Sequence, residues 1–407
     1  MKVKARYNDI VQILMSFLIA SFYIFEEKSF GSILLFILTS IIFIVMAVEY
    51  NFRIPFRIEY FHKVILIFAL YCFLSATWAI RADYAIEKGV TLIKILVCMS
   101  VLYSYYSIRE NALEELFVVL MWAGVIVVGY SYIFYGKKLI LDVILNSVRL
   151  ENAFSNVNSI GMLSGIMIII SVFKILYDKN IWYIILDIPA AILVLATGSR
   201  KALIIVLLGI FLVFFFKNFN KNILKTTIWI VFISISALFL VRWIMSLKVL
   251  SGIETRMEGV IALITGRGII ESSALLRYKY IKLGIDIFKK NPVFGVGMGN
   301  ARLFVANNYG HDSYLHNNYV ELLADGGIFG FIIYYYIYYI IIKDLIKYFR
   351  YREKYTVVVI VLVLMQLIMD YGSVSYYYKN AIFYFLIFFI CIRKMKERKR
   401  SGTVSFD

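Results

Sequence analysis

Residues 311–330, HDSYLHNNYVELLADGGIFG, mark the point where the longest hydrophilic segment of the chain meets a long apolar run. The stretch contains two histidines, two consecutive asparagines and a Gly-Gly pair, and the run that follows is rich in Ile and Tyr. A polar segment that passes directly into about twenty mostly apolar residues is typical of a loop that enters a membrane helix. We therefore expect a helix to begin near residue 319, at the edge of a bilayer.

The composition of the whole chain agrees with a membrane protein. Of its 407 residues, 62% are hydrophobic and 17% are charged, and the mean hydropathy is +0.82. Soluble domains carry about 25% charged residues. Because lipid offers no hydrogen-bond partner, apolar runs that span a bilayer must be helices or strands of a closed barrel, and their continuous apolarity excludes the barrel. We expect an all-α polytopic membrane protein in which residues 1–407 form a single membrane domain.

The apolar runs predict about twelve transmembrane helices. With twelve spans both termini lie on the same side, and most basic residues lie in the connections on that side or at the C-terminus, which the positive-inside rule assigns to the cytosol. The net charge of +17 is therefore explained by topology and does not indicate a nucleic acid partner. The predicted ranges are 9–25, 31–49, 64–80, 90–106, 113–135, 159–177, 181–196, 202–216, 226–247, 319–342, 355–371 and 377–392.

This topology places one long loop, residues 248–318, outside the cytosol, together with the shorter segments 136–158 and 197–201. Within the long loop, Ser272–Lys290 predicts an amphipathic helix, because Leu276, Tyr280, Leu283 and Ile287 recur at helical spacing. Such a helix could lie along the outer membrane surface.

Three arginines outside the cytosol are candidate functional residues. Arg200 stands between two apolar runs, where a guanidinium is costly unless it pairs or lines a cavity, although a snorkelling side chain is the alternative. Arg277 belongs to the polar side of the amphipathic helix, and its neutral interpretation is a solvated surface residue. Arg149 precedes a helix entry that contains Asn158, and an asparagine there either caps the helix or binds sugar hydroxyls.

His316 is the candidate general base, because the pKa of histidine near neutrality suits proton transfer. A hydrogen-bonded loop histidine is the alternative, and a metal site from His311, Asp312 and His316 lacks an obvious fourth ligand. Several other chemistries have no support. The chain has no GxxxxGK[ST] phosphate loop, and GVGMGN at 295–300 lacks the strand and helix of a dinucleotide site. The cysteines lie within apolar segments and indicate no disulfide framework or thiolate zinc site.

The order of three motifs resembles the O-antigen polymerase and ligase superfamily of bacterial membrane glycosyltransferases. The motifs are TGSRKAL at 197–203, LLRYKYIKLGIDIFKKNPVFGVGMGN at 275–300 and HNNYVELLADGGIFGF at 316–331. The resemblance is best over about 195–335, while the N-terminal helices agree only in number and character.

The resemblance implies a glycan donor on an undecaprenyl pyrophosphate carrier, used at the outer face of the cytoplasmic membrane without metal or other cofactor. Arg200 and Arg277 would stabilise the pyrophosphate leaving group, since guanidinium groups match phosphate oxygens in a bidentate manner. His316 would orient or deprotonate the acceptor hydroxyl. Arg149, Asn158, Asn317 and Asn318 would contact the substrate, and Gly326 with Gly327 would allow a re-entrant turn to approach the next span closely.

We expect a polymerase that joins lipid-linked repeat units into O-antigen or capsular polysaccharide. The alternative within the superfamily is a ligase that transfers finished glycan to lipid A–core, because both enzymes share the donor half of the reaction. A flippase or exporter of the same glycolipids is a further alternative, although the chain has three prolines and no internal repeat. A chain-length regulator and a flippase are the protein partners that this interpretation suggests, beside the lipid bilayer.

Overall fold

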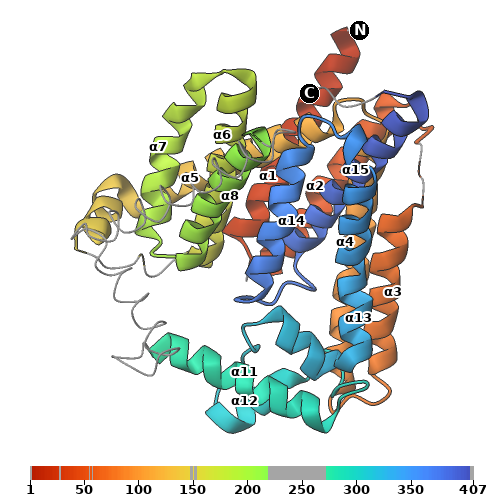
Figure 1. The fold of residues 1–407 in the computed structure, drawn as a ribbon, viewed down its shortest axis with the longest axis vertical. Coiled ribbons are helices and arrows are strands. Elements are labelled where there is room, and N and C mark those ends of the chain that lie inside the picture. The colour runs from red at the N-terminus through yellow and green to blue at the C-terminus, as the bar shows by residue number, and fades with distance from the viewer. Residues whose placement is uncertain are drawn as a thin grey trace. The chain divides into compact units, whose positions relative to one another are not determined.

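The computed structural model describes residues 2–26, 29–54, 56, 58–146, 150, 154–218 and 272–403. The regular structure of these residues is entirely helical, as Figure 1 shows, so the all-α prediction is confirmed for them. The chain divides into two compact units, the first formed by residues 1–45 and 114–270 and the second by residues 46–113 and 271–407. Each unit is described by itself, and the prediction of a single membrane domain stays a prediction.

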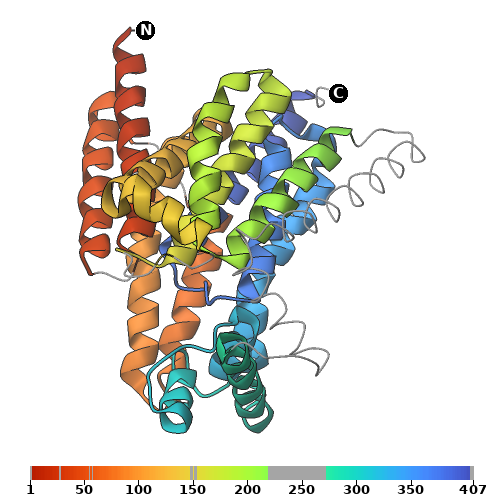
Figure 2. The same ribbon diagram turned by 90° about the vertical axis from the view of Figure 1, so that its left-hand side faces the viewer.

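In the first unit, α6, α7 and α8 pack side by side (Figure 2). α6 and α8 run parallel because α7 reverses the chain between them, and small residues allow their close approach: a Cβ on Gly165 would lie 2.9 Å from Val206 Cγ2. The helices of this unit are α1 (Lys2–Ile24), α2 (Ser29–Glu49), α5 (Ala112–Leu145), α6 (Val157–Asp178), η1 (Ile181–Tyr183), α7 (Ile184–Ala196) and α8 (Arg200–Asn218).

The second unit is organised around α15, which contacts α3, α4, α13 and α14. Most apolar side chains of α15 are buried on every side, as expected for a helix at the centre of a bundle. In Figure 1, α11 and α12 lie at the lower end of α3 and α13, away from the C-terminus. The helices are α3 (Tyr60–Ser75), α4 (Ala82–Ser107), α11 (Ser272–Lys290), α12 (Ala301–Tyr309), α13 (Asn318–Lys347), η3 (Phe349–Tyr351), α14 (Thr356–Asp370) and α15 (Lys379–Ser401).

Several described helices have the length and apolarity to cross a membrane, which is consistent with a polytopic membrane protein. Within the described residues, five segments meet both criteria: Tyr7–Ile24, Phe30–Glu49, Ala112–Leu145, Val157–Asp178 and Asn318–Lys347. Tyr60–Ser75, Ile181–Ala196 and Thr356–Asp370 are shorter apolar helices. The count of twelve spans stays a prediction.

The predicted helix positions agree with the structure wherever the structure describes them, and the predicted span 226–247 lies outside the described residues. Two differences matter for the site. α4 begins at Ala82, well before the apolar run that predicted it, so that Lys88 belongs to a helix and not to a connection. The long loop also contains α12, a short helix that its weak apolar pattern did not reveal.

The amphipathic helix was predicted correctly as α11, but its apolar face does not lie against lipid. Tyr280 and Ile287 are 1% and 3% exposed and pack in a cluster with residues of α12 and the start of α13. Leu276 and Leu283 pack against the same cluster. Protein therefore covers this face, and the position of α11 along the membrane surface stays a prediction.

Candidate functional site

α13 breaks at Gly326–Gly327, and the loop of residues 291–300 fills the break. Gly327 has φ 60° and ψ −163°, a conformation open essentially to glycine alone, and this releases the neighbouring peptide groups from the helical pattern. As the Gly-Gly pair predicted, the loop and the helix approach closely. Four backbone hydrogen bonds join them, from Val296 and Gly297 to Ala324 and Asp325 at 3.0 and 2.9 Å, and from Ile328 and Phe329 to Pro292 and Val293 at 2.9 and 3.3 Å.

The side chain of Asp325 fastens the same loop from α13. It is fully buried, and its two carboxylate oxygens accept hydrogen bonds from the amides of Gly299 and Ala301 at 2.9 and 2.7 Å. Since Ala301 is the first residue of α12, the carboxylate also stabilises the N-terminus of that helix. From α3, the hydroxyl of Tyr71 donates to the carbonyl of Gly326 at 2.5 Å. The loop is therefore held between α3 and α13.

The turn of residues 314–318, here called the His316 turn, leads from the loop into α13. His316 has φ 56°, in the left-handed region that few residues other than glycine adopt. Its two neighbours are fastened: the amide of Leu315 donates to Glu321 Oε2 at 2.7 Å, and the side chain of Asn317 caps α13 by accepting from the amide of Val320 at 3.1 Å. A strained conformation that its neighbours enforce in this way is characteristic of functional sites.

The imidazole of His316 lies between two tyrosine rings. It stacks on the buried ring of Tyr280 from α11, with centroids 5.9 Å apart and planes 9° from parallel, and its centroid is 4.2 Å from that of Tyr314. Arg277 precedes Tyr280 by three residues, so helical geometry places both on neighbouring positions of one face of α11. The structure thus places Tyr280, a residue predicted only as part of an apolar face, against the predicted base His316.

The two asparagines predicted as substrate contacts already have partners within the protein. The oxygen of Asn317 caps α13, as described above. Asn318 is fully buried, and its amide group makes four hydrogen bonds, which use its full capacity. They run from Nδ2 to Tyr335 Oη at 3.0 Å and Asp370 Oδ2 at 3.3 Å, and to Oδ1 from the amides of Ser375 and Tyr376 at 2.9 and 3.2 Å. Their role in substrate binding stays a prediction, while their role in holding the turn to α13 and α14 is a finding.

The remaining predicted site residues belong to the first unit. Arg200 is the first residue of α8 and is half-buried, and Asn158 lies in the first turn of α6, where its amide donates to the side chain of Asn156 at 3.0 Å. α6 and α8 are parallel neighbours, so both residues lie at the same end of this helix pair. Arg149 lies outside the described residues, although the next residue, Leu150, donates to the carbonyl of Ala196 at 3.2 Å, close to the turn before Arg200.

A cavity of about 190 Å³ lies beside the His316 turn in the second unit and is here called the Lys88 cavity. Lys88 comes from α4, Glu321 from the first turn of α13, and Tyr314 from the His316 turn itself. Neither Lys88 nor Tyr377 was among the residues predicted for the site from the sequence. The cavity is lined by Lys88, Gly299, Arg302, Asp312, Ser313, Tyr314, Glu321 and Tyr377.

Arg302 and Asp312 form a bidentate ion pair at the edge of this cavity, with Nε 2.6 Å from Oδ1 and Nη2 in contact with Oδ2. The guanidinium holds the pKa of the Asp312 carboxyl below its usual value of 3.8. His311 contacts the hydroxyl of Tyr280 through Nε2 and the carbonyl of Tyr309 through Nδ1. In the described part of the chain, no three His, Cys, Asp or Glu side chains are grouped to hold a metal ion, so the His311–Asp312–His316 site considered above is not formed.

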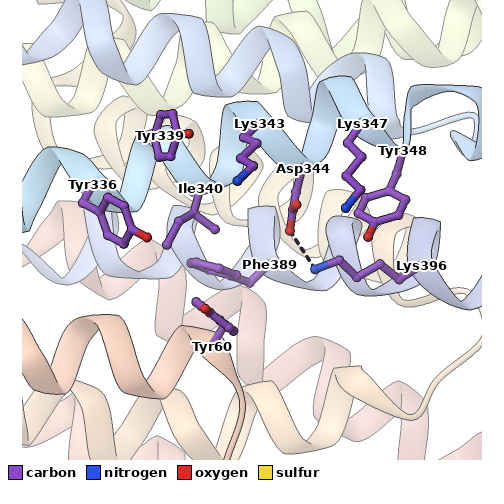
Figure 3. A pocket seen from close by; sticks show the side chains of 10 residues that line it. All are labelled: Tyr60, Tyr336, Tyr339, Ile340, Lys343, Asp344, Lys347, Tyr348, Phe389 and Lys396. Atoms are coloured by element: carbon purple, nitrogen blue, oxygen red, sulfur yellow. Dashed lines mark hydrogen bonds and ion pairs between the residues drawn. The ribbon is translucent and has the colours of Figure 1, made fainter.

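A larger cavity of about 280 Å³ lies near the other end of α13 and contains none of the predicted site residues (Figure 3). Its lining includes Lys343 and Lys347 of α13 together with Asp344, which pairs with Lys396 of α15 at 2.7 Å. The distance along α13 from Asn318 to Lys343 is roughly 40 Å at 1.5 Å per residue. This cavity is therefore separate from the His316 turn.

Comparison with known proteins agrees with the motifs that surround this geometry. Residues 185–335 match a family model described as O-antigen ligase. No curated protein matches the chain. The matched residues extend from α7 to the second part of α13 and include Arg200, Arg277, Asn317 and the whole His316 turn. The match confirms the resemblance found in the sequence for residues 185–335, which are similar to the O-antigen ligase family.

Proposed function

We propose that the protein is a membrane glycosyltransferase that joins lipid-linked oligosaccharide repeat units into O-antigen or capsular polysaccharide. The observation that carries this proposal is the family match over residues 185–335, which contains the strained and doubly fastened His316 turn. The donor is a glycan on undecaprenyl pyrophosphate, and the reaction takes place at the outer face of the bacterial cytoplasmic membrane. Both termini are cytosolic in this proposal, because most basic residues then lie on the cytosolic side.

The proposed reaction is a displacement at the anomeric carbon of the donor sugar. An acceptor hydroxyl forms a new C–O bond, the bond between the anomeric carbon and the pyrophosphate oxygen breaks, and the electron pair leaves with the lipid pyrophosphate. His316 takes the acceptor proton, an effect typically worth about 10²–10⁴ in rate. Arg200 and Arg277 neutralise the charge that develops on the leaving group, and the loss of one such contact is expected to cost about 3 kcal/mol.

The setting of His316 supports its part in this reaction. Its backbone is in the left-handed region, and its ring packs against the rings of Tyr280 and Tyr314, which limit its rotation. A fixed imidazole makes a better general base than a mobile one, because little orientational freedom is lost in the transition state. Arg149 and Asn158 are proposed as donor contacts.

A ligase that transfers finished glycan to lipid A–core is the second candidate, because the matched family model carries the description O-antigen ligase. The two activities share the donor, the leaving group and the general base, and they differ in the acceptor. A lipid-linked repeat unit is the acceptor of a polymerase, and a lipid A–core is the acceptor of a ligase.

The test is the surface glycolipid profile of a clean deletion strain, complemented with wild-type protein or with His316→Asn. Asparagine is chosen because it tolerates the left-handed backbone while it removes the imidazole. Single repeat units on the final anchor in the deletion strain would support a polymerase, and long polymer retained on the carrier would instead identify a ligase. An unchanged profile would refute both. If His316→Asn restores full polymer, the proposed base is wrong.

A further inference from the structure

Lys88 is a buried cation that faces the Lys88 cavity. The residue is 8% exposed, and among the described residues no carboxylate oxygen lies within 4.0 Å of its ammonium. The ammonium of Lys88 makes a cation–π contact with the ring of Tyr377, whose centroid is 3.8 Å from Nζ. A buried ammonium costs several kcal/mol unless a partner compensates it, and a cation–π contact offsets about 2 kcal/mol of this. The cavity therefore holds a donor group without a matching acceptor.

Glu321 presents a carboxyl group to the same cavity. Its residue is 4% exposed, and Oε2 accepts the hydrogen bond from Leu315 that fastens the His316 turn. The second oxygen, Oε1, has no such bond and remains an acceptor. Lys88 and Glu321 both line the cavity, yet they do not form an ion pair with each other. The fold thus keeps a buried amino group and a buried carboxyl group apart, at a cavity of about 190 Å³.

The arrangement restricts the chemistry of a ligand. An anionic group would be attracted by Lys88 but would lose favourable contact at the carboxyl group of Glu321, and the guanidinium of Arg302 is already paired with Asp312. A cationic group would be attracted by the carboxyl group of Glu321 but repelled by the ammonium of Lys88. A pair of hydroxyls satisfies both sides, because each hydroxyl accepts from the ammonium and donates to the carboxylate. The two tyrosines in the lining, Tyr314 and Tyr377, add aromatic surface suited to the C–H faces of a sugar ring.

The size and place of the cavity complete the argument. Sites for drug-sized ligands occupy about 300–1,000 Å³, so a cavity of about 190 Å³ suits one ring of a sugar and not an oligosaccharide. Tyr314 lines the cavity and packs against His316, so a ring bound there lies next to the proposed base.

We propose that the Lys88 cavity is a subsite for one neutral, hydroxyl-bearing sugar ring of the acceptor glycan, held between the ammonium of Lys88 and the carboxylate of Glu321. The assignment of this ring to the acceptor rests on the proposed function, whereas the binding of a neutral sugar ring does not. Lys88 would bind the substrate, and Glu321 would both bind it and position the turn.

The experiment is saturation-transfer NMR on the full-length protein in lipid nanodiscs. The probes are neutral methyl glycosides of hexoses, 6-deoxyhexoses and N-acetylhexosamines, with methyl glucuronate and inorganic phosphate as charged competitors. We expect at least one neutral glycoside to bind, and Lys88→Met and Glu321→Gln each to weaken it about tenfold to a hundredfold, as for a lost hydrogen bond to a charged group. Lys289→Met, which removes an exposed lysine of α11, is the matched control and should bind as the wild type.

Loss of binding through misfolding is distinguishable from loss of a contact. The melting temperature of Lys88→Met is measured beside its binding, and weaker binding supports the proposal only if the variant melts at the temperature of the wild type. Glu321→Gln retains a carbonyl oxygen for the amide of Leu315 and so keeps the turn. Unchanged binding in both variants would overturn the proposal, as would preferential binding of glucuronate or phosphate or a failure of every neutral glycoside to bind.

The two proposals also fail separately. Long polymer in the deletion strain together with Lys88-dependent glycoside binding would refute the polymerase and leave a sugar subsite. Loss of polymer in the deletion strain without any glycoside binding would refute the subsite alone.

Discussion

Replacement of Gly327 by alanine tests the claim that the break in α13 holds the site loop. A Cβ at this position would lie 2.4 Å from the carbonyl oxygen of Val293 and 2.6 Å from the amide nitrogen of Gly295. Both atoms belong to the backbone, so no side-chain rotation relieves the clash. The matched control is Gly326→Ala, because a Cβ at Gly326 would first meet the flexible side chain of Met298, with Sδ at 3.1 Å.

The magnitude follows from the conformation and the bonds that the clash disturbs. A non-glycine residue at φ 60° and ψ −163° costs about 1–3 kcal/mol. Displacement of the loop also weakens the hydrogen bonds from Ile328 and Phe329 to Pro292 and Val293, at about 1 kcal/mol each. We expect Gly327→Ala to lower the free energy of local opening by about 3–5 kcal/mol, while Gly326→Ala lowers it by about 1 kcal/mol or less.

Hydrogen–deuterium exchange of the protein in nanodiscs measures this difference directly. A loss of about 3 kcal/mol corresponds to exchange that is more than a hundredfold faster, and it should appear in peptides that contain residues 295–300 and 325–329. Exchange of α15 should not change. Equal exchange in Gly327→Ala and the wild type would refute the reasoning, and so would equal acceleration in the two alanine variants.

Three further predictions concern the turn and its surroundings. Asn318→Leu leaves the buried amides of Ser375 and Tyr376 without an acceptor and should cost about 2–4 kcal/mol in thermal unfolding, whereas Asn308→Ala, at an exposed position, should change the melting temperature little. Because Arg302 lowers the pKa of Asp312, the ion pair stabilises the fold above about pH 4 and is lost as the pH falls through the folded-state value. The difference in melting temperature between the wild type and Asp312→Asn should thus be equal at pH 7 and pH 5 and vanish only below pH 4; a change between pH 7 and 5 would contradict it. Finally, Tyr280→Leu should keep α11 folded but lower glycan polymer in the complemented deletion strain, because His316 loses the ring on which it stacks, while Tyr278→Leu, at an exposed position of α11, should not.

Much of the fold follows from local properties of the sequence. Within the described residues, each predicted apolar run forms a helix, because burial of such a run in lipid or in a protein core is favourable wherever it packs. The break at Gly326–Gly327 follows from a residue pair. α11 was predicted with its correct limits because its period is a property of neighbouring residues. The period shows that one face of α11 is apolar, but it does not show whether lipid or protein covers that face. Only the structure shows that residues of α12 and α13 pack against it.

The chemical site depended on the tertiary structure. His316 and Arg277 were predicted as site residues from sequence motifs. Tyr280, which stacks on His316, was predicted only as part of an amphipathic pattern. Asn318 was predicted as a substrate contact, and only the fold shows its four partners from α13, α14 and the α14–α15 connection. Lys88 and Glu321 are separated by more than two hundred positions in the chain. They line one cavity because α4 and α13 both begin near it. The sequence by itself determined which segments are helices, because apolar periodicity is local; only the tertiary structure decided which polar groups face each other, because such pairing joins distant segments that carry no local signal of it.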